Sequence, residues 1–405
     1  MAVGKDCFPK MYPVPGFQLG TTSAGIKTSG RKDLVVMEIA EGGAVAGVFT
    51  KNAFCAAPVQ LAKAHVVTTP PRYLVTNTGN ANAGTGESGR ENARAVCQAM
   101  GKVAGIAEEA VLPFSTGVIG ESLPVDKIIA ALPMAFSALS ESGWQDAAQG
   151  ILTTDTRSKG ASVQLTLLGK TITITGISKG SGMIKPNMAT MLAYVATDAV
   201  LDQAMLQVLV NDAVEASFNR ITVDGDTSTN DCTMLVATGA SGVSIVELPT
   251  EEQASFKSAL LDVFISLAQQ IVQDGEGASK FVTVDVMGGS DSSECLAVAY
   301  TVAESPLVKT ALFASDPNWG RILAAIGRSG VPDLDVDAVQ VYLGEVLIAE
   351  QGGRAASYTE ARGQAVMDQD EISIRILLNR GYVNETVWTT DLSYDYVKIN
   401  AEYRT

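Results

Sequence analysis

Histidine is almost absent from this 405-residue chain, which contains only His65. Zinc sites usually draw on several histidines or on clustered cysteines, so this scarcity argues against a metal centre, and we expect none. A Ser-His-Asp or Cys-His mechanism would depend on His65 alone. Because His65 stands between Ala64 and Val66, we expect a packed or surface residue rather than a catalytic base.

Cysteine pairs are also lacking. The five cysteines are odd in number, widely spaced and without a C-x-x-C pair: Cys7, Cys55, Cys97, Cys232 and Cys295. A disulfide framework or a clustered metal site would need closer or paired cysteines. The pattern predicts reduced, mostly structural thiols of a cytosolic protein.

Positive charge is scarce. The 29 Lys+Arg residues face 44 Asp+Glu residues, which gives a formal net charge of −15, and no basic cluster interrupts it. Binding to a polyanion is driven largely by counterion release from a basic surface. We therefore expect neither nucleic acid nor an anionic membrane as a partner.

Long apolar runs are missing as well. The longest, residues 296–303, contains Thr301 and is far shorter than the roughly 20 residues that a membrane helix needs. Residues 1–9 show neither the apolar core of a signal peptide nor an Arg/Ser-rich amphipathic stretch. The expected location is the cytoplasm.

Apolar residues nevertheless make up 46% of the chain, which is enough for a large core. Apolar runs and alternation predict strands over 34–40, 73–77, 163–167, 172–174, 280–286, 339–343, 346–349, 371–377 and 383–389. Helical spacing and start signals predict helices over 88–103, from Pro124, over 201–218 and over 250–273. Because several strands follow one another directly, the predicted fold class is α+β, with antiparallel sheets covered by helices.

Three short motifs resemble known phosphate or nucleophile motifs but lack their context. Six residues separate the glycines of residues 84–89 (G-x-G-x-x-G) from the predicted strand end at Asn77. A dinucleotide site needs these glycines at the tight turn directly after the strand. Residues 176–180 match G-x-S-x-G, but a poor helix start and no histidine follow. Residues 169–171 resemble the end of a P-loop, yet they fit the turn of a hairpin better.

The segment from Lys179 to Tyr194 is unusual. Glycine and proline punctuate it before Ala189 and Thr190, and an apolar strand-like stretch follows at once. A self-cleaving N-terminal threonine would need such a junction, because the loop lets the backbone bend and the strand holds the new terminus. The spacing alone favours an ordinary strand start, because Ala-Thr at such a position is usually without a special role.

Further motifs accompany this segment in a fixed order: 25–27, 48–52, 56–59, 77–83, 115–121, 153–156, 223–231, 274–278, 315–321 and 396–405. With them the chain resembles the ornithine acetyltransferase family (glutamate N-acetyltransferase, ArgJ) over nearly its whole length. One departure is Gly84, where the family's asparagine-rich loop has cysteine.

The resemblance implies an autocatalytic mechanism. The chain would be cleaved between Ala189 and Thr190, and the freed α-amino group of Thr190 would serve as general base. Its reference pKa of about 7.7–8, far below the ~10.4 of lysine, suits that task in a chain with one histidine. Thr190 would take the acetyl group from N2-acetyl-L-ornithine and pass it to L-glutamate.

The resemblance also assigns the site. It places the oxyanion donors at Thr116 and Gly117, a segment that would otherwise read as a plain turn. It places substrate binding at Thr153, Lys179, Thr190, Glu276, Asn400 and Thr405, where the alternatives are surface charges and an unimportant C-terminus. Lys179 is a suitable carboxylate partner and Glu276 a suitable ammonium partner.

The family architecture is an αββα sandwich similar to that of DmpA, built from two autoproteolytic chains with a smaller C-terminal α/β subdomain at about 285–405. Residues 1–189 would form the α-chain and residues 190–405 the β-chain, assembled as a heterotetramer of two chains of each kind. The resemblance implies no cofactor, with acetyl-CoA as a co-substrate only in a bifunctional enzyme.

Two other functions remain open from the sequence. One is an N-terminal-nucleophile amidase or aminopeptidase of similar fold, in which water is the final acceptor. The other is an unprocessed, non-catalytic binding protein.

Overall fold

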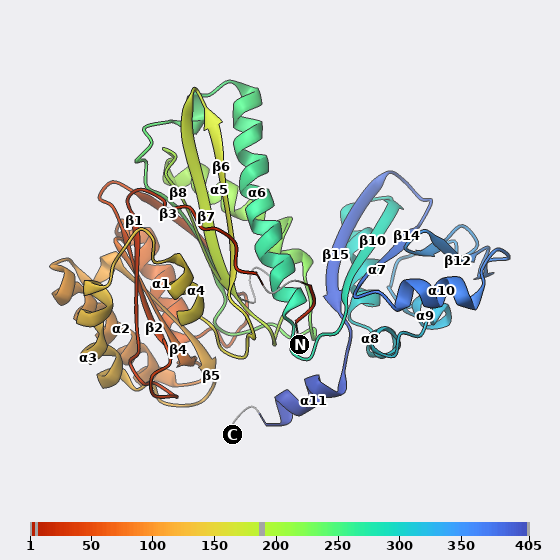
Figure 1. The fold of residues 1–405 in the computed structure, drawn as a ribbon, viewed down its shortest axis with the longest axis horizontal. Coiled ribbons are helices and arrows are strands. Elements are labelled where there is room, and N and C mark those ends of the chain that lie inside the picture. Colours follow the sequence, from red (N-terminus) through yellow and green to blue (C-terminus); the bar gives the residue numbers. More distant parts are fainter. Residues whose placement is uncertain (1, 5–6, 186–190, 403–405) are drawn as a thin grey trace. The chain divides into compact units, whose positions relative to one another are not determined.

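The computed structural model describes residues 2–4, 7–185 and 191–402. The chain divides into two compact units (Figure 1). The two-sheet unit comprises Cys7–Asn219 and Thr227–Ile271. The C-terminal unit comprises Met1–Asp6, Arg220–Asp226 and Val272–Thr405.

The two-sheet unit contains two separate β-sheets. The first has the order β1-β2-β4-β5, formed by Phe17–Thr22, Leu34–Ile39, Tyr73–Asn80 and Val111–Val118. The second has the order β3-β9-β8-β7-β6, formed by Ala44–Phe49, Cys232–Ala237, Leu192–Thr197, Lys170–Lys179 and Lys159–Leu167. Neighbouring strands are antiparallel except for the pairs β4–β5 and β8–β9, which are parallel.

The two sheets face each other across a common apolar core. Phe17, Met37 and Phe114 of the first sheet share this core with Ile177 and Tyr194 of the second. The rings of Phe114 and Tyr194 meet edge to face at 5.6 Å, a favourable aromatic geometry. This inter-sheet core is the centre of the unit.

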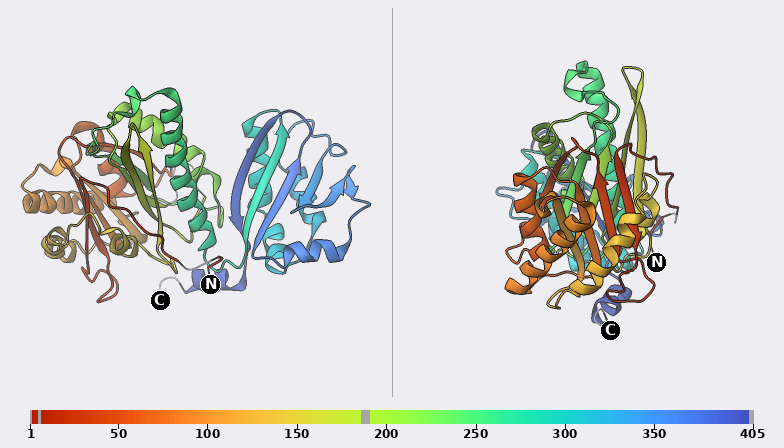
Figure 2. Two further views of the ribbon diagram at one scale, coloured as in Figure 1. Left: turned by 45° about the horizontal axis from the view of Figure 1, so that its top comes forward. Right: turned by 90° about the vertical axis from the view of Figure 1, so that its left-hand side faces the viewer.

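Helices cover the outer faces. On the first sheet lie α2 (Gly86–Ala104) and α3 (Val125–Ser137), with α1 (Ala57–Thr68) beside β5. Helix α4 (Trp144–Gly150) is different, because it packs against β1 and β7 and contributes Trp144 to the inter-sheet core. On the second sheet lie α5 (Gln203–Glu215) and α6 (Thr250–Gln273). Figure 2 shows α6 running along β7, where Gly176 leaves room for Leu267. The layers are helix, sheet, sheet and helix, which confirms the predicted α+β class and the αββα arrangement.

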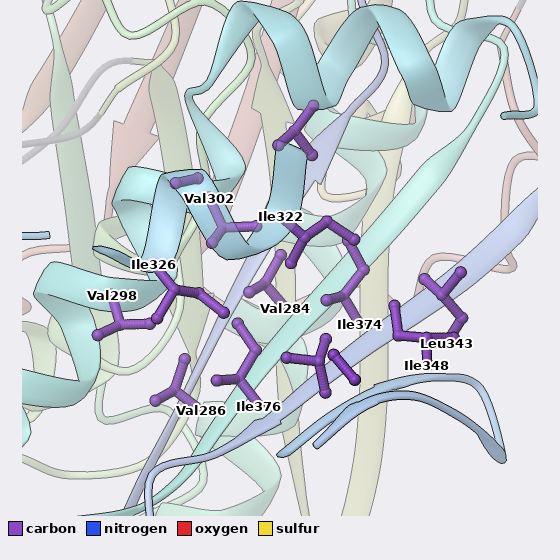
Figure 3. Close-up of a cluster of buried hydrophobic side chains, with 14 of the residues drawn as sticks. Val284, Val286, Val298, Val302, Ile322, Ile326, Leu343, Ile348, Ile374 and Ile376 are labelled. Atoms are coloured by element: carbon purple, nitrogen blue, oxygen red, sulfur yellow. The ribbon is translucent and has the colours of Figure 1, made fainter. Parts of the chain in front are cut away.

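The C-terminal unit is one six-stranded sheet with helices packed on it. Its order is β13-β12-β11-β14-β10-β15, formed by Gly353–Arg354, Val346–Glu350, Gln340–Leu343, Glu371–Leu377, Phe281–Gly289 and Val383–Thr390. Its helices are α7 (Ser292–Ala303), α8 (Pro306–Phe313), α9 (Trp319–Gly327), α10 (Glu360–Met367) and α11 (Tyr394–Ala401). In Figure 3 the strand residues Val284 and Ile374 meet the helix residues Val302 and Ile322 in a core of branched aliphatic side chains.

The hairpin predicted around residue 169 is present, but its turn lies one residue earlier than expected. Strand β6 ends at Leu167 and β7 begins at Lys170, so Leu168 and Gly169 form the turn. Both have positive φ angles, as a type I′ turn requires. Ser178 is buried within β7, which excludes a nucleophile elbow there.

The longest apolar stretch, residues 296–303, belongs to α7 and packs into the C-terminal core. Across residues 2–4, 7–185 and 191–402, none of the helices combines the length and the apolar character that crossing a bilayer requires.

Candidate active site

Thr116 and Lys179 continue two rows of inward-facing side chains in the two-sheet unit. Two residues earlier, Phe114 on β5 and Ile177 on β7 belong to the inter-sheet core. Side chains two residues apart on a strand share a face, so the sequence directs Thr116 and Lys179 into the space between the sheets. There Lys179 Nζ donates a hydrogen bond to Thr116 Oγ1 at 3.1 Å.

Thr153 completes this group. It lies in the loop after α4, and its Oγ1 accepts a second hydrogen bond from Lys179 Nζ at 3.4 Å. The structure therefore gathers three of the residues assigned from the sequence, Thr116, Thr153 and Lys179, around one ammonium group. They come from a strand of the first sheet, a loop and a strand of the second sheet.

A buried ion pair supports this group. Asp155 Oδ1 lies 2.6 Å from Lys159 Nζ, and neither side chain has exposed surface. The same oxygen accepts a hydrogen bond from Gly180 N at 2.7 Å, while Oδ2 accepts one from Thr153 N at 3.0 Å. Asp155 thus fixes the backbone on both sides of the site, beside Lys179 and at Thr153.

The charge of Asp155 is stabilised by its neighbours. Burial by itself would raise the pKa of this carboxyl group, because the charged form loses hydration. The ammonium groups of Lys159 and Lys179 and the hydrogen bonds outweigh this effect and hold the pKa of Asp155 well below its usual range. Asp155 is therefore an anion at neutral pH and balances one of the two lysines.

Gly117 is required by the close approach of β4 and β5. Its φ angle is +134°, and a Cβ atom built there would lie 2.3 Å from the carbonyl carbon of Gly79 and 2.5 Å from Asn80 N. No larger residue fits without moving backbone. The Thr116-Gly117 pair therefore belongs to a strand held against the asparagine-rich segment, and the alternative of a plain turn is wrong.

Asparagines of two motifs hold this strand in place. Ser115 Oγ donates to Asn77 Oδ1 at 2.6 Å across the β4–β5 pair. Asn230 Nδ2 donates to the carbonyl oxygens of Ala81 and Ser115 at 2.5 and 2.9 Å. The asparagine-rich motif therefore has a structural role here, because it satisfies buried backbone groups around Thr116.

Glu276 and Asn400 form a second group, in the C-terminal unit. Asn400 on α11 donates from Nδ2 to Glu276 Oε2 at 2.7 Å, and Glu276 is buried. Nearby, Tyr396 donates to Asp224 Oδ2 at 3.3 Å. Burial, followed by the charges of Asp224 and Glu276, raises the pKa of Tyr396 far above its usual value. The C-terminal helix thus docks on an acidic part of its own unit.

Three of the assigned residues, Ala189, Thr190 and Thr405, lie outside the described residues. The flanking strands of the cleavage segment are described. Lys179, the last residue of β7, pairs with Leu192, the first of β8. Met191 is buried, and its carbonyl oxygen accepts a hydrogen bond from Cys232 N at 2.9 Å.

Two buried acids of the site were missed by sequence reasoning. Asp155 lies inside the motif 153–156, and Asp231 ends the motif 223–231. An acid in a polar motif next to a threonine or asparagine is a weak signal, because burial shows only in the folded chain. Lys159, at the start of β6, carried no sequence signal.

The remaining candidates have structural roles. His65 is buried, and its Nδ1 lies 2.8 Å from the carbonyl oxygen of Val111, which confirms a packed histidine. All five cysteines are free. Within the described part of the chain, no group of three or more His, Cys, Asp or Glu side chains is arranged to hold a metal ion.

The sequence comparisons with known proteins identify one family. The ArgJ family model matches residues 18–405. The arginine biosynthesis bifunctional proteins ArgJ of Pseudomonas syringae pv. tomato and Pseudomonas fluorescens are 63% and 62% identical over 406 residues, and cover both chains completely. A solved structure of the arginine biosynthesis bifunctional protein ArgJ from Bacillus halodurans shows 38% sequence identity and a TM-score of 0.49. The match covers 51% of this chain and 97% of the Bacillus halodurans chain. The chain therefore belongs to the ArgJ family of arginine-biosynthesis enzymes, which confirms the resemblance to ornithine acetyltransferases seen in its motifs.

Proposed function

We propose that this enzyme transfers the acetyl group of N2-acetyl-L-ornithine to L-glutamate through an acetyl ester on Thr190, after it has cleaved its own chain between Ala189 and Thr190. The observation that carries the proposal is the convergence of Lys179 on Thr116 and Thr153. This polar group lies at the end of β7, where the chain enters the cleavage segment.

Cleavage needs no external reagent except water. The hydroxyl oxygen of Thr190 attacks the carbonyl carbon of Ala189, the C–N bond breaks, and the nitrogen takes up the hydroxyl proton. Water then hydrolyses the resulting ester and leaves a carboxylate on Ala189 and a free α-amino group on Thr190. The new amine and the restored hydroxyl belong to the same residue, as in other N-terminal nucleophiles.

Transfer then takes place in two half-reactions. In its neutral form, the α-amino group takes the hydroxyl proton while the oxygen attacks the acetyl carbonyl. The proton passes to the leaving nitrogen, ornithine departs, and the acetyl ester remains. The neutral α-amine of glutamate attacks that ester, and the hydroxyl of Thr190 regains its proton as acetylglutamate forms.

Both half-reactions pass through a tetrahedral oxyanion, and Thr116 and Gly117 are the proposed donors to it. An ammonium group can only donate, so Thr116 Oγ1 accepts the hydrogen bond from Lys179. The threonine hydroxyl then keeps its own hydrogen for another acceptor. A donor aimed at a developing oxyanion is worth about 3–4 kcal/mol of transition-state stabilisation.

For substrate binding we propose Lys179 and Thr153 as partners of a carboxylate group. The proposed partners of the remaining groups of the amino acid are Glu276, Asn400, Thr190 and Thr405. Lys179 suits an anion because it already lies among hydroxyl groups and carries a charge. Glu276 suits an ammonium group because it is a buried acid.

The wider assignment follows the same family. Residues 1–189 and 190–405 are the proposed α- and β-chains, the latter with a C-terminal subdomain from about residue 285. Two copies of each chain form the proposed heterotetramer in the cytoplasm. We propose no resident cofactor, with acetyl-CoA as a further acetyl donor, in line with the word bifunctional in the names of the relatives.

The proposal is tested by giving the purified enzyme N-acetylornithine with and without glutamate. Acetylglutamate that forms in step with ornithine supports transfer. Free acetate as the main product in the presence of glutamate would identify an amidase instead. Absence of both products would indicate a binding protein.

A further inference from the structure

Helix α11 is held on the C-terminal unit by polar contacts rather than by apolar burial. None of the side chains described for this helix is buried. Ser393 caps its first turn, since Ser393 Oγ accepts a hydrogen bond from Tyr396 N at 3.2 Å. The same hydroxyl donates to the carbonyl oxygen of Gly277 at 2.7 Å. The helix is therefore anchored at the residue that follows Glu276 in the chain.

Gly277 allows the helix to come this close. Its φ angle is +70°, and a Cβ atom built there would lie 2.5 Å from Tyr396 N and 2.6 Å from Ser393 Oγ. Any side chain at position 277 would push the first turn of α11 away. The start of the helix is thus fixed by backbone contact, and the residues one turn further along are placed from there.

Tyr396 fixes the side of the helix that faces the acidic residues. Its hydroxyl donates to Asp224 Oδ2 at 3.3 Å. Burial, followed by the charges of Asp224, Glu276 and Asp226, raises the pKa of Tyr396 far above its usual value, so the hydroxyl keeps its proton and acts as the donor. The charge of Asp224 also acts on the buried ammonium group of Lys309, which ties this carboxylate to the core of the unit.

Asn400 lies one turn beyond Tyr396, on the same face of the helix. Its Nδ2 donates to Glu276 Oε2 at 2.7 Å and to the carbonyl oxygen of Tyr396 at 3.0 Å, so both amide hydrogens are used. Both partners can only accept, which means that the amide nitrogen and not the amide oxygen must face them. What Asn400 and Glu276 can still offer a ligand is therefore oxygen acceptors alone.

A subsite that offers only acceptors, one of them a buried carboxylate, favours a ligand group that donates and is positively charged. A primary ammonium group on an alkyl chain meets this requirement, since it has three hydrogens to donate. A methyl group in the same place would donate nothing to the carboxylate.

We propose that Tyr396 is a positioning residue that gives this subsite its preference for the side-chain ammonium group of acetylornithine, an inference that rests on the proposed function because it takes Glu276 and Asn400 as binding residues. Tyr396 acts through Asn400. Its hydroxyl holds α11 at Asp224, and its carbonyl oxygen takes the second amide hydrogen of Asn400, so that the amide oxygen remains an acceptor. Without the hydroxyl contact, the helix loosens and the amide of Asn400 is no longer held in this orientation.

The test compares two ligands that differ only in the ammonium group. N2-acetyl-L-ornithine is the donor, and N-acetyl-L-norvaline, whose side chain ends in a methyl group, is its competitor. Ornithine release at saturating glutamate gives kcat and KM for the donor. Competition gives Ki for acetylnorvaline whether or not it is turned over. For the wild type we expect a KM at least about tenfold below this Ki, the factor that one charge-assisted hydrogen bond provides.

Tyr396→Phe should raise the KM for acetylornithine about tenfold and leave both kcat and the Ki of acetylnorvaline unchanged. The matched control is Tyr394→Phe on the same helix. The Tyr394 side chain is exposed, and its ring packs edge to face on Phe313 at 5.5 Å, a contact that the variant keeps. Its kinetic constants should equal those of the wild type.

An equal rise of KM and Ki in Tyr396→Phe would show a general loosening of the helix and would overturn the inference. So would an unchanged KM, a fall in kcat alone, or a wild-type KM as high as the Ki. If Tyr396→Phe does not fold, Asp224→Ala takes its place with the same expected values, because it removes the acceptor of the same hydrogen bond. Free acetate in place of acetylglutamate from the wild type would instead refute the proposed function, while the comparison of the two ligands would still stand.

Discussion

Asp155 and Lys159 form an ion pair without exposed surface, and the same carboxyl oxygen binds Gly180 N, the residue after Lys179. A buried pair of this kind contributes little compared with apolar residues, but the loss of one partner leaves the other charge unpaired. The position of Lys179 therefore depends on Asp155, although Asp155 itself need not contact the substrate.

Replacing Asp155 by asparagine should lower the free energy of unfolding by about 3–5 kcal/mol, because the Lys159 charge remains buried. The measurement is chemical denaturation at pH 7. The matched control is Asp146→Asn, since Asp146 pairs with Lys32 at the surface and its loss should cost no more than about 1 kcal/mol.

The same pair predicts how stability depends on pH. The pKa of Asp155 is lower in the folded chain than its unfolded value of about 3.9, so its contribution is present above pH 4 and is lost as the pH falls below it. Wild-type stability should therefore decrease more steeply between pH 4 and pH 2 than that of Asp155→Asn. Parallel stability curves for the two proteins between pH 4 and pH 2 would show that the ionisation of Asp155 does not contribute to this pH dependence.

Replacing Thr116 by valine keeps the shape of the side chain but removes the hydroxyl group. We expect kcat to fall about 10²–10³-fold, because one donor to the oxyanion is lost. Thr116→Ser, which keeps the hydroxyl, should retain most of the activity. Full activity in Thr116→Val would remove this hydroxyl group from the proposed oxyanion site.

Replacing Lys179 by methionine should raise the KM for N-acetylornithine about 10–100-fold, since a charge-assisted hydrogen bond is worth about 1.5–3 kcal/mol. The control is Lys170→Met on the same strand, where the exposed ammonium binds only the carbonyl oxygen of Ser241 in the described structure. Steady-state kinetics distinguishes the two. An unchanged KM in Lys179→Met would remove this lysine from substrate binding.

The burial of Lys309 in the C-terminal unit predicts that the stability of the fold depends on pH in the alkaline range. Its ammonium group is buried and binds Thr389 Oγ1 and the carbonyl oxygen of Thr390, and burial lowers its pKa to about 8. Between pH 8 and about 10.4 the unfolded chain binds this proton and the folded chain does not, so stability rises with pH. We expect the wild type to gain about 2–3 kcal/mol relative to Lys309→Met over this range. A constant difference between the two unfolding curves would refute the low pKa.

Local signals in the sequence predicted several elements well. The helix over 250–273 coincides with α6, because its start signal and its length are encoded locally. The hairpin was predicted by alternation on both sides of a glycine. Strands β1, β3 and β5 were not predicted, since β3 and β5 include Gly47, Pro113 and Gly117, and no simple alternation marks them.

The site was only partly accessible from the sequence. Motif resemblance identified Thr116, Thr153 and Lys179, which the structure brings together. The resemblance gave no reason why position 117 must be glycine. The reason is the close approach of Gly79 on the neighbouring strand, which leaves no room for a side chain at position 117. The role of Asp155 arises from burial and from its contact with Gly180, a residue distant in the sequence, neither of which a local pattern encodes.

In the proposed function, the chain cuts itself to create the catalytic residue. The most direct measurement is N-terminal sequencing and intact mass of freshly purified, active enzyme, with Thr190→Ala as the comparison. We expect two fragments from the wild type, one of them beginning Thr-Met-Leu-Ala-Tyr, and a single inactive chain from Thr190→Ala. Fully active wild-type enzyme that runs as one intact 42.3 kDa chain would contradict it.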